Sequence, residues 1–308
     1  MSRIIITDKR LQLSIGVFTI HISQRLSYNK LYYLPDSAEQ FLDSKDMDTP
    51  ELNINYTIQL EDSFQELEDT PAAGFDDGPY PYRIYRISSD SFLWIRKNKY
   101  NEIQVAFRIS NDWTSWSLVA DNSKSSGSNS FTELAYIFAY SILNKGGILF
   151  HGVVMEWRGM GIIVCAHSGV GKTTHTSMWR DNENALILNG DRALCCREDD
   201  RWYTYGAPWS GSSGENRNRR VELGVVVILE QAKTNEVSVL SPLQGALELI
   251  PLAFAPDWEE KLINCALDTI DNIARSIPVL KLRCRPDLEA VAILKAELEK
   301  LTENKNII

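Results

Sequence analysis

The segment MGIIVCAHSGVGKTTH, residues 160–175, decides the fold of the second half of the chain. It opens with an apolar run that ends at Cys165, and a short apolar run beside turn residues is typical of a buried strand. Gly169 and Gly171 follow, and glycine permits the backbone conformations that turn successive N–H groups toward one point. We therefore predict a strand, a glycine loop and a helix in succession.

A glycine loop in this position predicts a phosphate-binding site. The inward N–H groups and the positive end of the helix would hold a polyphosphate. Lys172 would reach the β and γ phosphates, and the Thr173 hydroxyl would bind magnesium. Ala166 replaces the usual first glycine of the motif. The loop residues expected to contact ATP are His167, Ser168, Gly169, Val170, Gly171, Lys172, Thr173 and Thr174. The alternative is a glycine turn without a ligand.

Magnesium prefers oxygen ligands, and Asp191 is the first carboxylate candidate. It follows the predicted strand 185–190, and a parallel neighbouring strand would place that end beside the glycine loop. Asp191 would then bind the metal together with Thr173, or orient the acceptor hydroxyl. The alternative is a surface turn at Asn-Gly-Asp. Glu230, after the apolar run 225–229, is the second candidate.

Two further features accompany these motifs. His151 falls in the predicted strand 148–156, where a lone histidine is more often a packed core residue. The segment 206–220 is long and irregular, as binding loops often are. Its arginines, Arg217 among them, could stabilise charge on a transferring phosphoryl group, and Trp209 could form an apolar wall. The alternative for this segment is a solvated surface loop.

The pattern of the sequence changes near residue 125. Residues 61–78 are acidic and end in Gly and Pro, which predicts a solvated loop, and residues 82–119 read as an antiparallel meander. Serines at 122–129 mark the best linker candidate, after which strands and helices alternate as in an α/β domain. We predict a smaller β-rich α+β domain at 1–125, which helps to recognise substrate, and a catalytic α/β domain at 126–308.

The composition limits the partners. The chain of 308 residues carries 32 basic and 41 acidic side chains and a net charge of −9, which argues against a nucleic-acid-binding surface. Its five cysteines contain no CxxC pair, so reduced thiols are expected. No apolar run approaches the roughly 18 residues of a membrane helix. We expect a cytoplasmic protein that binds neither nucleic acid nor membrane.

From His151 to Glu230 the chain resembles the catalytic domain of HPr kinase/phosphorylase, whose nucleotide site is related to that of phosphoenolpyruvate carboxykinase. The resemblance rests on His-Gly-Val-Val at 151–154, on the strand and loop just quoted, and on the short interval from Lys172 to Asp191. Gly-Ala-Pro-Trp-Ser-Gly at 206–211 resembles a subgroup often labelled HPr serine kinase, some members of which accompany peptide-modifying gene clusters.

The chain also differs from HPr kinases. It has Gly190-Asp191 where those enzymes carry two aspartates. Their acid-and-arginine element has its nearest equivalent here in Glu215 with Arg217. Residues 1–125 do not resemble the regulatory domain of HPr kinase, so the acceptor need not be HPr.

The resemblance implies a P-loop fold and a kinase that depends on ATP and Mg²⁺. Ser168 and Lys172 would contact phosphates, Thr173 and Asp191 would serve magnesium, and His151 would line the catalytic site. The acceptor would be a serine or threonine hydroxyl on a peptide or small protein, such as a ribosomal precursor peptide or an HPr-like protein. The family also implies a homo-oligomer.

Two alternatives stay open at the level of the sequence. One is a small-molecule or carboxykinase-like kinase, and the other is an ATP-binding switch that works through a partner. A GTPase is disfavoured, because the chain contains no Asn-Lys-x-Asp element for reading guanine.

Overall fold

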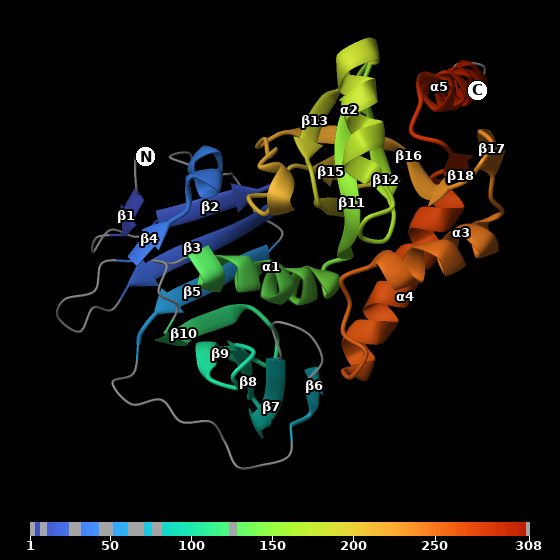
Figure 1. The fold of residues 1–308 in the computed structure, drawn as a ribbon. Helices are drawn as coiled ribbons and strands as arrows, with labels where there is room; N and C mark the ends of the chain where they lie inside the picture. Colours follow the sequence, from blue (N-terminus) through green and yellow to red (C-terminus); the bar gives the residue numbers. More distant parts are fainter. Residues whose placement is uncertain are drawn as a thin grey trace. The chain divides into compact units, whose positions relative to one another are not determined.

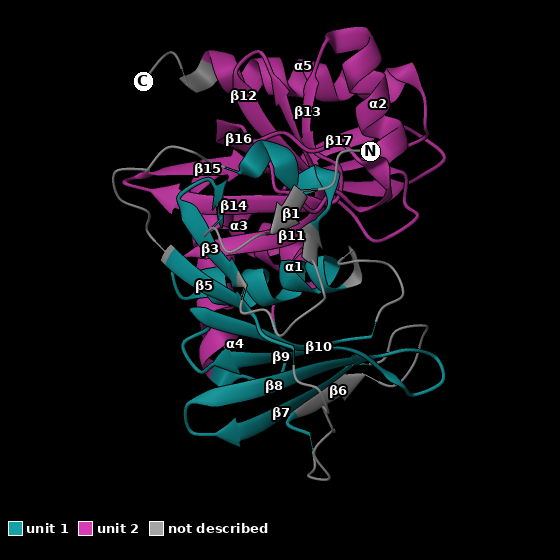
Figure 2. Cartoon of the chain, turned by 90° about the vertical axis from the view of Figure 1, so that its left-hand side faces the viewer, with its two compact units in different colours: residues 1–145, 256–260 teal, residues 146–255, 261–308 magenta. Residues whose placement is uncertain are grey.

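The chain forms two compact units, each with its own sheet. The computed structural model describes residues 4–6, 11–24, 32–42, 52–60, 71–75, 82–122 and 128–305. Unit 1 comprises residues 1–145 and 256–260, and unit 2 comprises residues 146–255 and 261–308 (Figure 2). The predicted boundary near residue 125 lies outside the described residues. The two units divide after Lys145, so that helix α1 (Ser128–Leu143) belongs to unit 1.

Unit 1 is built on an eight-stranded sheet with the order β2-β3-β5-β10-β9-β8-β7-β6 (Figure 1). Its strands are β2 (Leu11–Ile15), β3 (Phe18–Gln24), β5 (Leu52–Ile58), β6 (Ala73–Phe75), β7 (Tyr82–Ser88), β8 (Ser91–Lys97), β9 (Ile103–Ser110) and β10 (Ser115–Asp121). Strands β7 to β10 pair antiparallel in succession, which confirms the predicted meander. Strand β5 pairs parallel with β3 and β10. Strands β1 (Ile4–Ile6) and β4 (Tyr32–Leu34) form a separate pair. Of the predicted acidic loop at 61–78, only 71–75 lies within the described residues.

Helix α1 packs on the sheet of unit 1 through large apolar side chains. Phe138 contacts Phe18 edge to face, with 5.7 Å between ring centroids. The Ser141 hydroxyl donates to the backbone oxygen of Trp113 at 2.6 Å and accepts from the indole N–H of Trp116 at 3.2 Å. Since buried polar groups are costly without partners, these bonds allow a serine in the helix–sheet contact. Residues 256–260 join this unit through Trp258, which packs against Phe92 and Trp113.

The sheet of unit 2 has the strand order β12-β11-β14-β15-β16-β18-β17, with β13 paired to β11 beside this path. Its strands are β11 (Gly147–Trp157), β12 (Met160–Cys165), β13 (Leu186–Asn189), β14 (Arg192–Glu198), β15 (Arg201–Tyr205), β16 (Arg220–Gln231), β17 (Glu236–Val239) and β18 (Val279–Cys284). Strand β12 also pairs parallel with β16, so the path from β12 through β11, β14 and β15 to β16 closes on itself. Strands β14, β15 and β17 have no counterpart among the strands predicted from the sequence.

The helices of unit 2 are α2 (Lys172–Glu183), α3 (Pro242–Leu249), α4 (Glu260–Ser276) and α5 (Leu288–Lys305). Alternate residues of the central strands, such as Ile162 and Val164, form one buried core with Trp179 of α2 and Leu294 of α5. Helix α3 approaches β18 closely, because a Cβ at Gly245 would meet the side chain of Val279 at 2.9 Å. Helix α3 ends at Leu249, and a 3₁₀ turn continues to Leu252.

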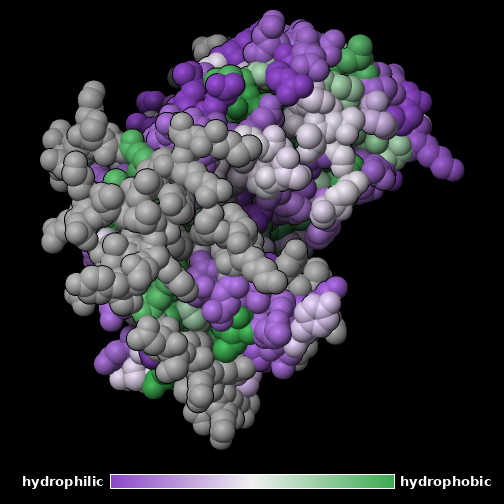
Figure 3. Space-filling view, turned by 60° about the vertical axis from the view of Figure 1, so that its left-hand side comes forward, coloured by the Kyte–Doolittle hydropathy of each residue, from purple (hydrophilic) through white to green (hydrophobic). Residues whose placement is uncertain are grey.

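The two sheets and their helices make a mixed α/β protein. On the face drawn in Figure 3, hydrophilic residues cover most of the described surface. The large hydrophobic side chains that are most exposed include Leu243 and Leu247 of α3. In the part of the chain that the structure describes, every helix is too short or too polar to span a bilayer.

Candidate functional site

The predicted strand, glycine loop and helix are present at the expected residues. Strand β12 ends at Cys165, and α2 begins at Lys172. Gly169 has a φ of 80° and Gly171 a φ of 108°, which side-chain-bearing residues rarely adopt. A Cβ at either position would meet no heavy atom of the described residues within 4 Å. The backbone conformation, rather than crowding, therefore requires these glycines, and the space outside the loop is open.

The start of α2 suits an anion. Gly171 caps the helix without a side-chain hydrogen bond, and the first turn carries no acidic residue. Helix N-termini present unsatisfied N–H groups and a partial positive charge. Ser168, Thr173 and Thr174 are exposed around this opening. A phosphate chain is the ligand chemistry that such a helix start favours.

Lys172 is held against the loop by backbone oxygens. Its Nζ donates to the oxygen of Ala166 at 2.8 Å and to that of His167 at 3.3 Å, and its side chain is mostly buried. Burial lowers the pKa of Lys172, and the negative charge of Asp191 acts in the opposite direction. The amine is therefore placed at the loop before any phosphate arrives.

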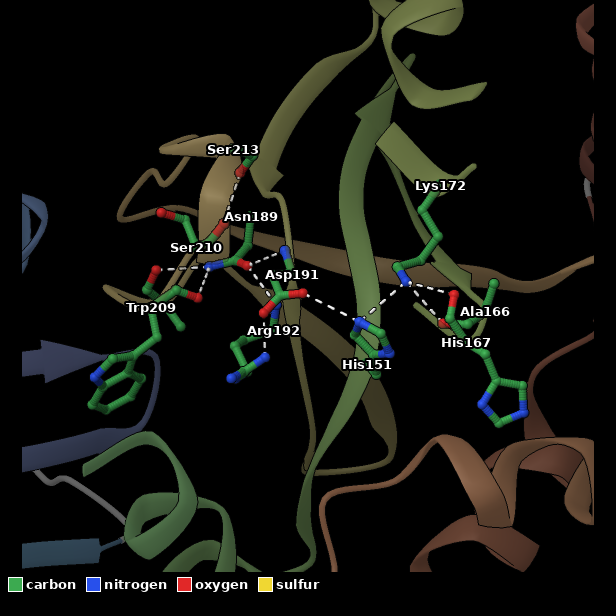
Figure 4. Close-up of polar contacts among 11 residues, drawn as sticks. His151, Ala166, His167, Lys172, Asn189, Asp191, Arg192, Trp209, Ser210 and Ser213 are labelled. Carbon is green, nitrogen blue, oxygen red and sulfur yellow. Dashed lines mark hydrogen bonds and ion pairs between the residues drawn. The ribbon is translucent and has the colours of Figure 1, made fainter. Parts of the chain in front are cut away.

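Lys172, His151 and Asp191 form one line of polar contacts (Figure 4). The Nε2 atom of His151 lies 3.2 Å from Lys172 Nζ and 3.3 Å from Asp191 Oδ1. Nε2 carries either a lone pair or a proton. It can accept from the lysine or donate to the carboxylate, but not both at once. The imidazole is thus a junction between the amine and the acid.

The pairing of β11 explains how Asp191 reaches this junction. Strand β11 pairs antiparallel with β14 through residues 147–151 and with β13 through residues 154–156. Strands β13 and β14 thus follow one another along the same side of β11, with Gly190 and Asp191 between them. The backbone N–H of Gly152 donates to the backbone oxygen of Asp191 at 3.2 Å. The predicted parallel neighbour for the strand before Asp191 was wrong, because β13 lies antiparallel beside β11 and the chain continues directly into β14.

Asn189 stabilises the bend between the two strands. Its Oδ1 accepts from the backbone N–H groups of Asp191 at 2.9 Å and Arg192 at 2.7 Å. Its Nδ2 donates to the backbone oxygens of Ala207 at 2.7 Å and Trp209 at 3.2 Å. Asn189 is fully buried. One amide side chain therefore connects the Asp191 backbone to the segment that follows β15.

Asp191 is partly buried beside two cations and an imidazole. It forms an ion pair with Arg192, whose guanidinium stacks over the ring of Phe254 at 4.5 Å from its centroid. The ring of His151 faces the same phenylalanine edge to face. Burial acts to raise the pKa of Asp191, but the hydrogen bond from His151 and the charges of Arg192 and Lys172 outweigh it, so the pKa is lowered. The group is a carboxylate at neutral pH.

The segment 206–220 is buried in its first part, residues 206–210, and mostly exposed from residue 211 onward. Ala207, Trp209 and Ser210 are buried. Arg217 Nε donates to the backbone oxygen of Ile187 at 3.2 Å, which places this predicted catalytic arginine against β13. The described contacts do not join Arg217 to the line of Lys172, His151 and Asp191.

Charged side chains around the same segment have partners of their own. Arg219 pairs with Glu156 at 2.7 Å and Arg220 with Glu198 at 2.9 Å. Glu215 accepts from Arg180 of α2 at 2.9 Å. Arg219 and Arg220 therefore each have a carboxylate partner on a strand of the unit 2 sheet.

Glu230, the second carboxylate candidate, lies on the other side of the glycine loop. Its carboxylate pairs with Lys281 and Arg283, each at 3.0 Å, and its pKa is lowered through hydrogen bonds from these two residues. A cavity of about 240 Å³ lies between the loop residues Gly169–Gly171, the end of β16 at Leu229–Gln231 and residues 284–286. Glu230 borders this cavity and not the contact line around His151.

The residues present fit a nucleotide with magnesium. The uncapped helix start and Lys172 match a phosphate chain. Thr173 and Asp191 offer the hydroxyl and carboxylate oxygens that Mg²⁺ accepts while it keeps waters and phosphate oxygens as further ligands. Within the described ranges, no group of three or more His, Cys, Asp or Glu side chains could hold a metal by itself.

Three residues of the site had no assigned role at the level of the sequence. Asn189 and Arg192 flank Asp191, and Phe254 supports both His151 and Arg192. An Asn-Gly-Asp run favours side-chain-to-backbone hydrogen bonds, which is a local signal for Asn189. Phe254 carries no such signal, because it is far from His151 and Arg192 in the sequence. Its backbone N–H donates to the backbone oxygen of Leu149 at 2.8 Å, which places it beside β11.

Comparison with known proteins gives a distant likeness to solved structures. No family model matches the sequence, and no curated protein matches it. Among solved structures the chain is similar to the HPr(Ser) kinase/phosphatase from Coxiella burnetii, with 8% sequence identity and a TM-score of 0.29. The match covers 51% of this chain and 95% of the other. The resemblance to HPr kinases stays a prediction from the sequence.

Proposed function

We propose that unit 2 is a P-loop kinase domain of the HPr kinase type, which transfers the γ-phosphoryl group of ATP in the presence of Mg²⁺. The acceptor is a serine or threonine hydroxyl on a peptide or small protein. The observation that carries the proposal is the contact line from Lys172 through His151 to Asp191 beside an uncapped helix start. A glycine turn without a ligand would not need a lysine, an imidazole and a carboxylate at its opening.

Each residue of the line has a separate task. The N–H groups of the glycine loop and the amine of Lys172 bind the phosphate chain. Thr173 and Asp191 hold magnesium, which neutralises phosphate charge when it is bound. Asp191 suits a ligand role because its lowered pKa keeps it ionised. Phosphoryl transfer depends mainly on positioning and electrostatics, and these groups supply both.

His151 orients the acceptor hydroxyl. When Lys172 turns to a phosphate, Nε2 of His151 no longer shares a hydrogen with the amine, and its lone pair is free for a hydroxyl proton. The edge of Phe254 restricts the rotation of the imidazole. A base held within hydrogen-bond reach of the hydroxyl is the arrangement that proton transfer requires.

The acceptor class rests on the sequence resemblance and on the presence of unit 1. A kinase for a small metabolite needs no second sheet, whereas an acceptor peptide needs a surface that recognises its chain. Unit 1 contains a separate eight-stranded sheet, which supports assigning acceptor recognition to it. Recognition by unit 1 also leaves the acceptor open to peptides other than HPr.

Transfer of radioactive γ-phosphate tests the proposal. The full chain is incubated with labelled ATP and Mg²⁺, once with a pool of peptides and small proteins and once with a pool of metabolites. We expect label on serine or threonine of a peptide, and none with Lys172→Ala. Lys300→Ala, an exposed lysine on α5, is the matched control and should label as the wild type does.

Three other results would contradict the proposal in different ways. Label in the metabolite pool alone would identify a small-molecule kinase. Tight ATP binding without a labelled acceptor would favour a nucleotide-binding switch. Undiminished transfer by Lys172→Ala would remove the glycine loop from the mechanism.

A further inference from the structure

His175 of α2 is a buried histidine that the contact line does not use. It is 2% exposed, and its Nε2 lies 3.1 Å from the indole nitrogen of Trp179. An indole N–H can only donate, so Nε2 must accept and carries no proton. A neutral imidazole protonated on its other nitrogen satisfies this bond.

The fixed tautomer leaves one buried donor. The proton sits on Nδ1, and Nδ1 has no hydrogen-bond partner in the part of the chain that the structure describes. A buried donor without an acceptor costs on the order of 1–3 kcal/mol, and native proteins contain few of them. A ligand that brings an acceptor to Nδ1 would remove this cost.

The cavity beside the glycine loop offers the place for such a ligand. His175 and Thr174 border it from α2, and Gly169–Gly171 border it from the glycine loop. Its volume of about 240 Å³ is below the range of about 300–1,000 Å³ for sites that enclose a whole drug-sized ligand. The cavity is therefore large enough for a flat ring system but not for an entire nucleotide.

The walls of the cavity favour an uncharged, largely apolar ring. Leu229, Val170 and Pro286 contribute apolar surface. The charged residues at its border are already paired. Glu230 binds Lys281 and Arg283, and Arg285 binds Asp287 at 2.8 Å and Glu289 at 2.9 Å. Gln231 donates to the oxygen of Val170 at 3.1 Å, which holds it against the loop. His175, whose Nδ1–H has no partner among the described residues, also borders the cavity.

We propose that this cavity binds the purine base of the nucleotide and that Nδ1–H of His175 donates to a ring nitrogen of the base. The inference rests on the proposed function, because the phosphates of the same nucleotide occupy the glycine loop. A purine ring is flat, uncharged and rich in acceptor nitrogens. It can therefore contact the apolar walls and also accept a hydrogen bond from the single donor. A phosphate or a sugar alone would not do both.

Isothermal titration calorimetry of the full chain in the presence of Mg²⁺ tests the inference. The ligands are tripolyphosphate, ATP, and the 1-deaza, 3-deaza and 7-deaza analogues of ATP, each of which replaces one ring nitrogen by carbon. We expect ATP to bind more tightly than tripolyphosphate. We also expect one analogue to bind about three- to tenfold more weakly than ATP, which corresponds to one lost hydrogen bond.

A double variant assigns the hydrogen bond to His175. His175→Leu with Trp179→Phe removes the donor without leaving the indole unpaired. The double variant should bind ATP more weakly than the wild type by the same factor, and it should bind tripolyphosphate with unchanged affinity. It should also bind ATP and the sensitive analogue equally well. Asn182→Ala, an exposed position on the same helix, should behave as the wild type does.

The outcomes separate the inference from the proposed function. If all three analogues bind within about twofold of ATP, no ring nitrogen is recognised and the inference is wrong. If ATP binds no more tightly than tripolyphosphate, the cavity does not hold the base. If neither ligand binds, the glycine loop is not a phosphate site, and the proposed function fails together with the inference.

Discussion

The side-chain oxygen of Asn189 accepts hydrogen bonds from the backbone N–H of Asp191 at 2.9 Å and from that of Arg192 at 2.7 Å. These bonds hold the chain in the bend that presents the Asp191 carboxylate to His151. The geometry of the carboxylate thus depends on a residue that touches no ligand in the proposed mechanism.

Asn189→Ala should lower both stability and transfer. It leaves two N–H groups and two backbone oxygens without their partner in a buried place, so we expect the free energy of unfolding to fall by about 2–4 kcal/mol. The turnover number should fall more than the affinity for ATP, because the bend around Asp191 loosens while the glycine loop stays. Urea unfolding and steady-state kinetics measure the two effects. Asn182→Ala should change neither, and an equal effect of the two variants would refute the role of Asn189.

His151→Phe should reduce phosphoryl transfer by at least about 100-fold, as expected for the loss of a positioned proton acceptor. The phenyl ring fills a similar volume beside Phe254, so ATP affinity should stay within about threefold. Single-turnover transfer and calorimetry separate the two quantities. His21→Phe, a histidine of β3 paired with Asn53, is the matched control. A His151→Phe protein that transfers at the wild-type rate would show that His151 is only a packed strand residue.

Gly171→Ala should weaken nucleotide binding through the backbone alone. A φ of 108° strains any side-chain-bearing residue, at a cost of about 1–3 kcal/mol, although a methyl group there meets no neighbour among the described residues. The loop would relax, and its N–H groups would lose their alignment. Gly146→Ala also introduces a methyl group at positive φ, but before β11, and should leave ATP affinity unchanged. Calorimetry with ATP compares them, and equal affinities would contradict the prediction.

The free protein should lose stability between about pH 6.5 and about pH 4 because of His175. A histidine in an unfolded chain titrates near about 6.5, whereas burial lowers the pKa of His175 to about 4. Between these values the unfolded chain binds the proton and the folded chain does not. The stability from His175 is therefore complete above about pH 6.5, decreases as the pH falls toward 4, and amounts to about 3 kcal/mol.

Urea unfolding at pH 7.0 and pH 4.5 measures this contribution. The variant His175→Leu/Trp179→Phe should show a smaller loss on acidification than the wild type. His21→Phe should keep the full loss, because it retains His175. If the double variant and the wild type lose the same stability, His175 is not buried in the neutral form.

The local part of the site could be predicted from the sequence. An apolar run, two glycines and a lysine within residues 160–175 specify a strand, a loop and a helix through short-range preferences. The structure places β12, the positive-φ glycines and the start of α2 at these residues. The same reasoning identified Asp191 as a candidate, because an acid that closely follows an apolar run can be recognised from the sequence alone.

The long-range part could not be predicted. The place of His151 between Lys172 and Asp191 depends on the pairing of β11 with β13 and β14 along one side. The sequence analysis missed β14, in which only Ala193-Leu194-Cys195-Cys196 separates flanking charges. Without β14, the strand before Asp191 was assigned a parallel neighbour. The carboxylate partners of Arg219 and Arg220 lie on strands that are distant in the sequence, so these ion pairs could not be predicted from the residues around the arginines.

The closed path of paired strands in unit 2 has a consequence for how the molecule opens. A strand at a sheet edge can separate by breaking its hydrogen bonds to one neighbour. Strand β11, however, is hydrogen-bonded to β12, β13 and β14. Deuterium should therefore enter the amides around His151 only when the whole unit unfolds, and much later than it enters β17 at the end of the strand order. The imidazole of His151 would then keep its position while other parts of the protein open and close locally.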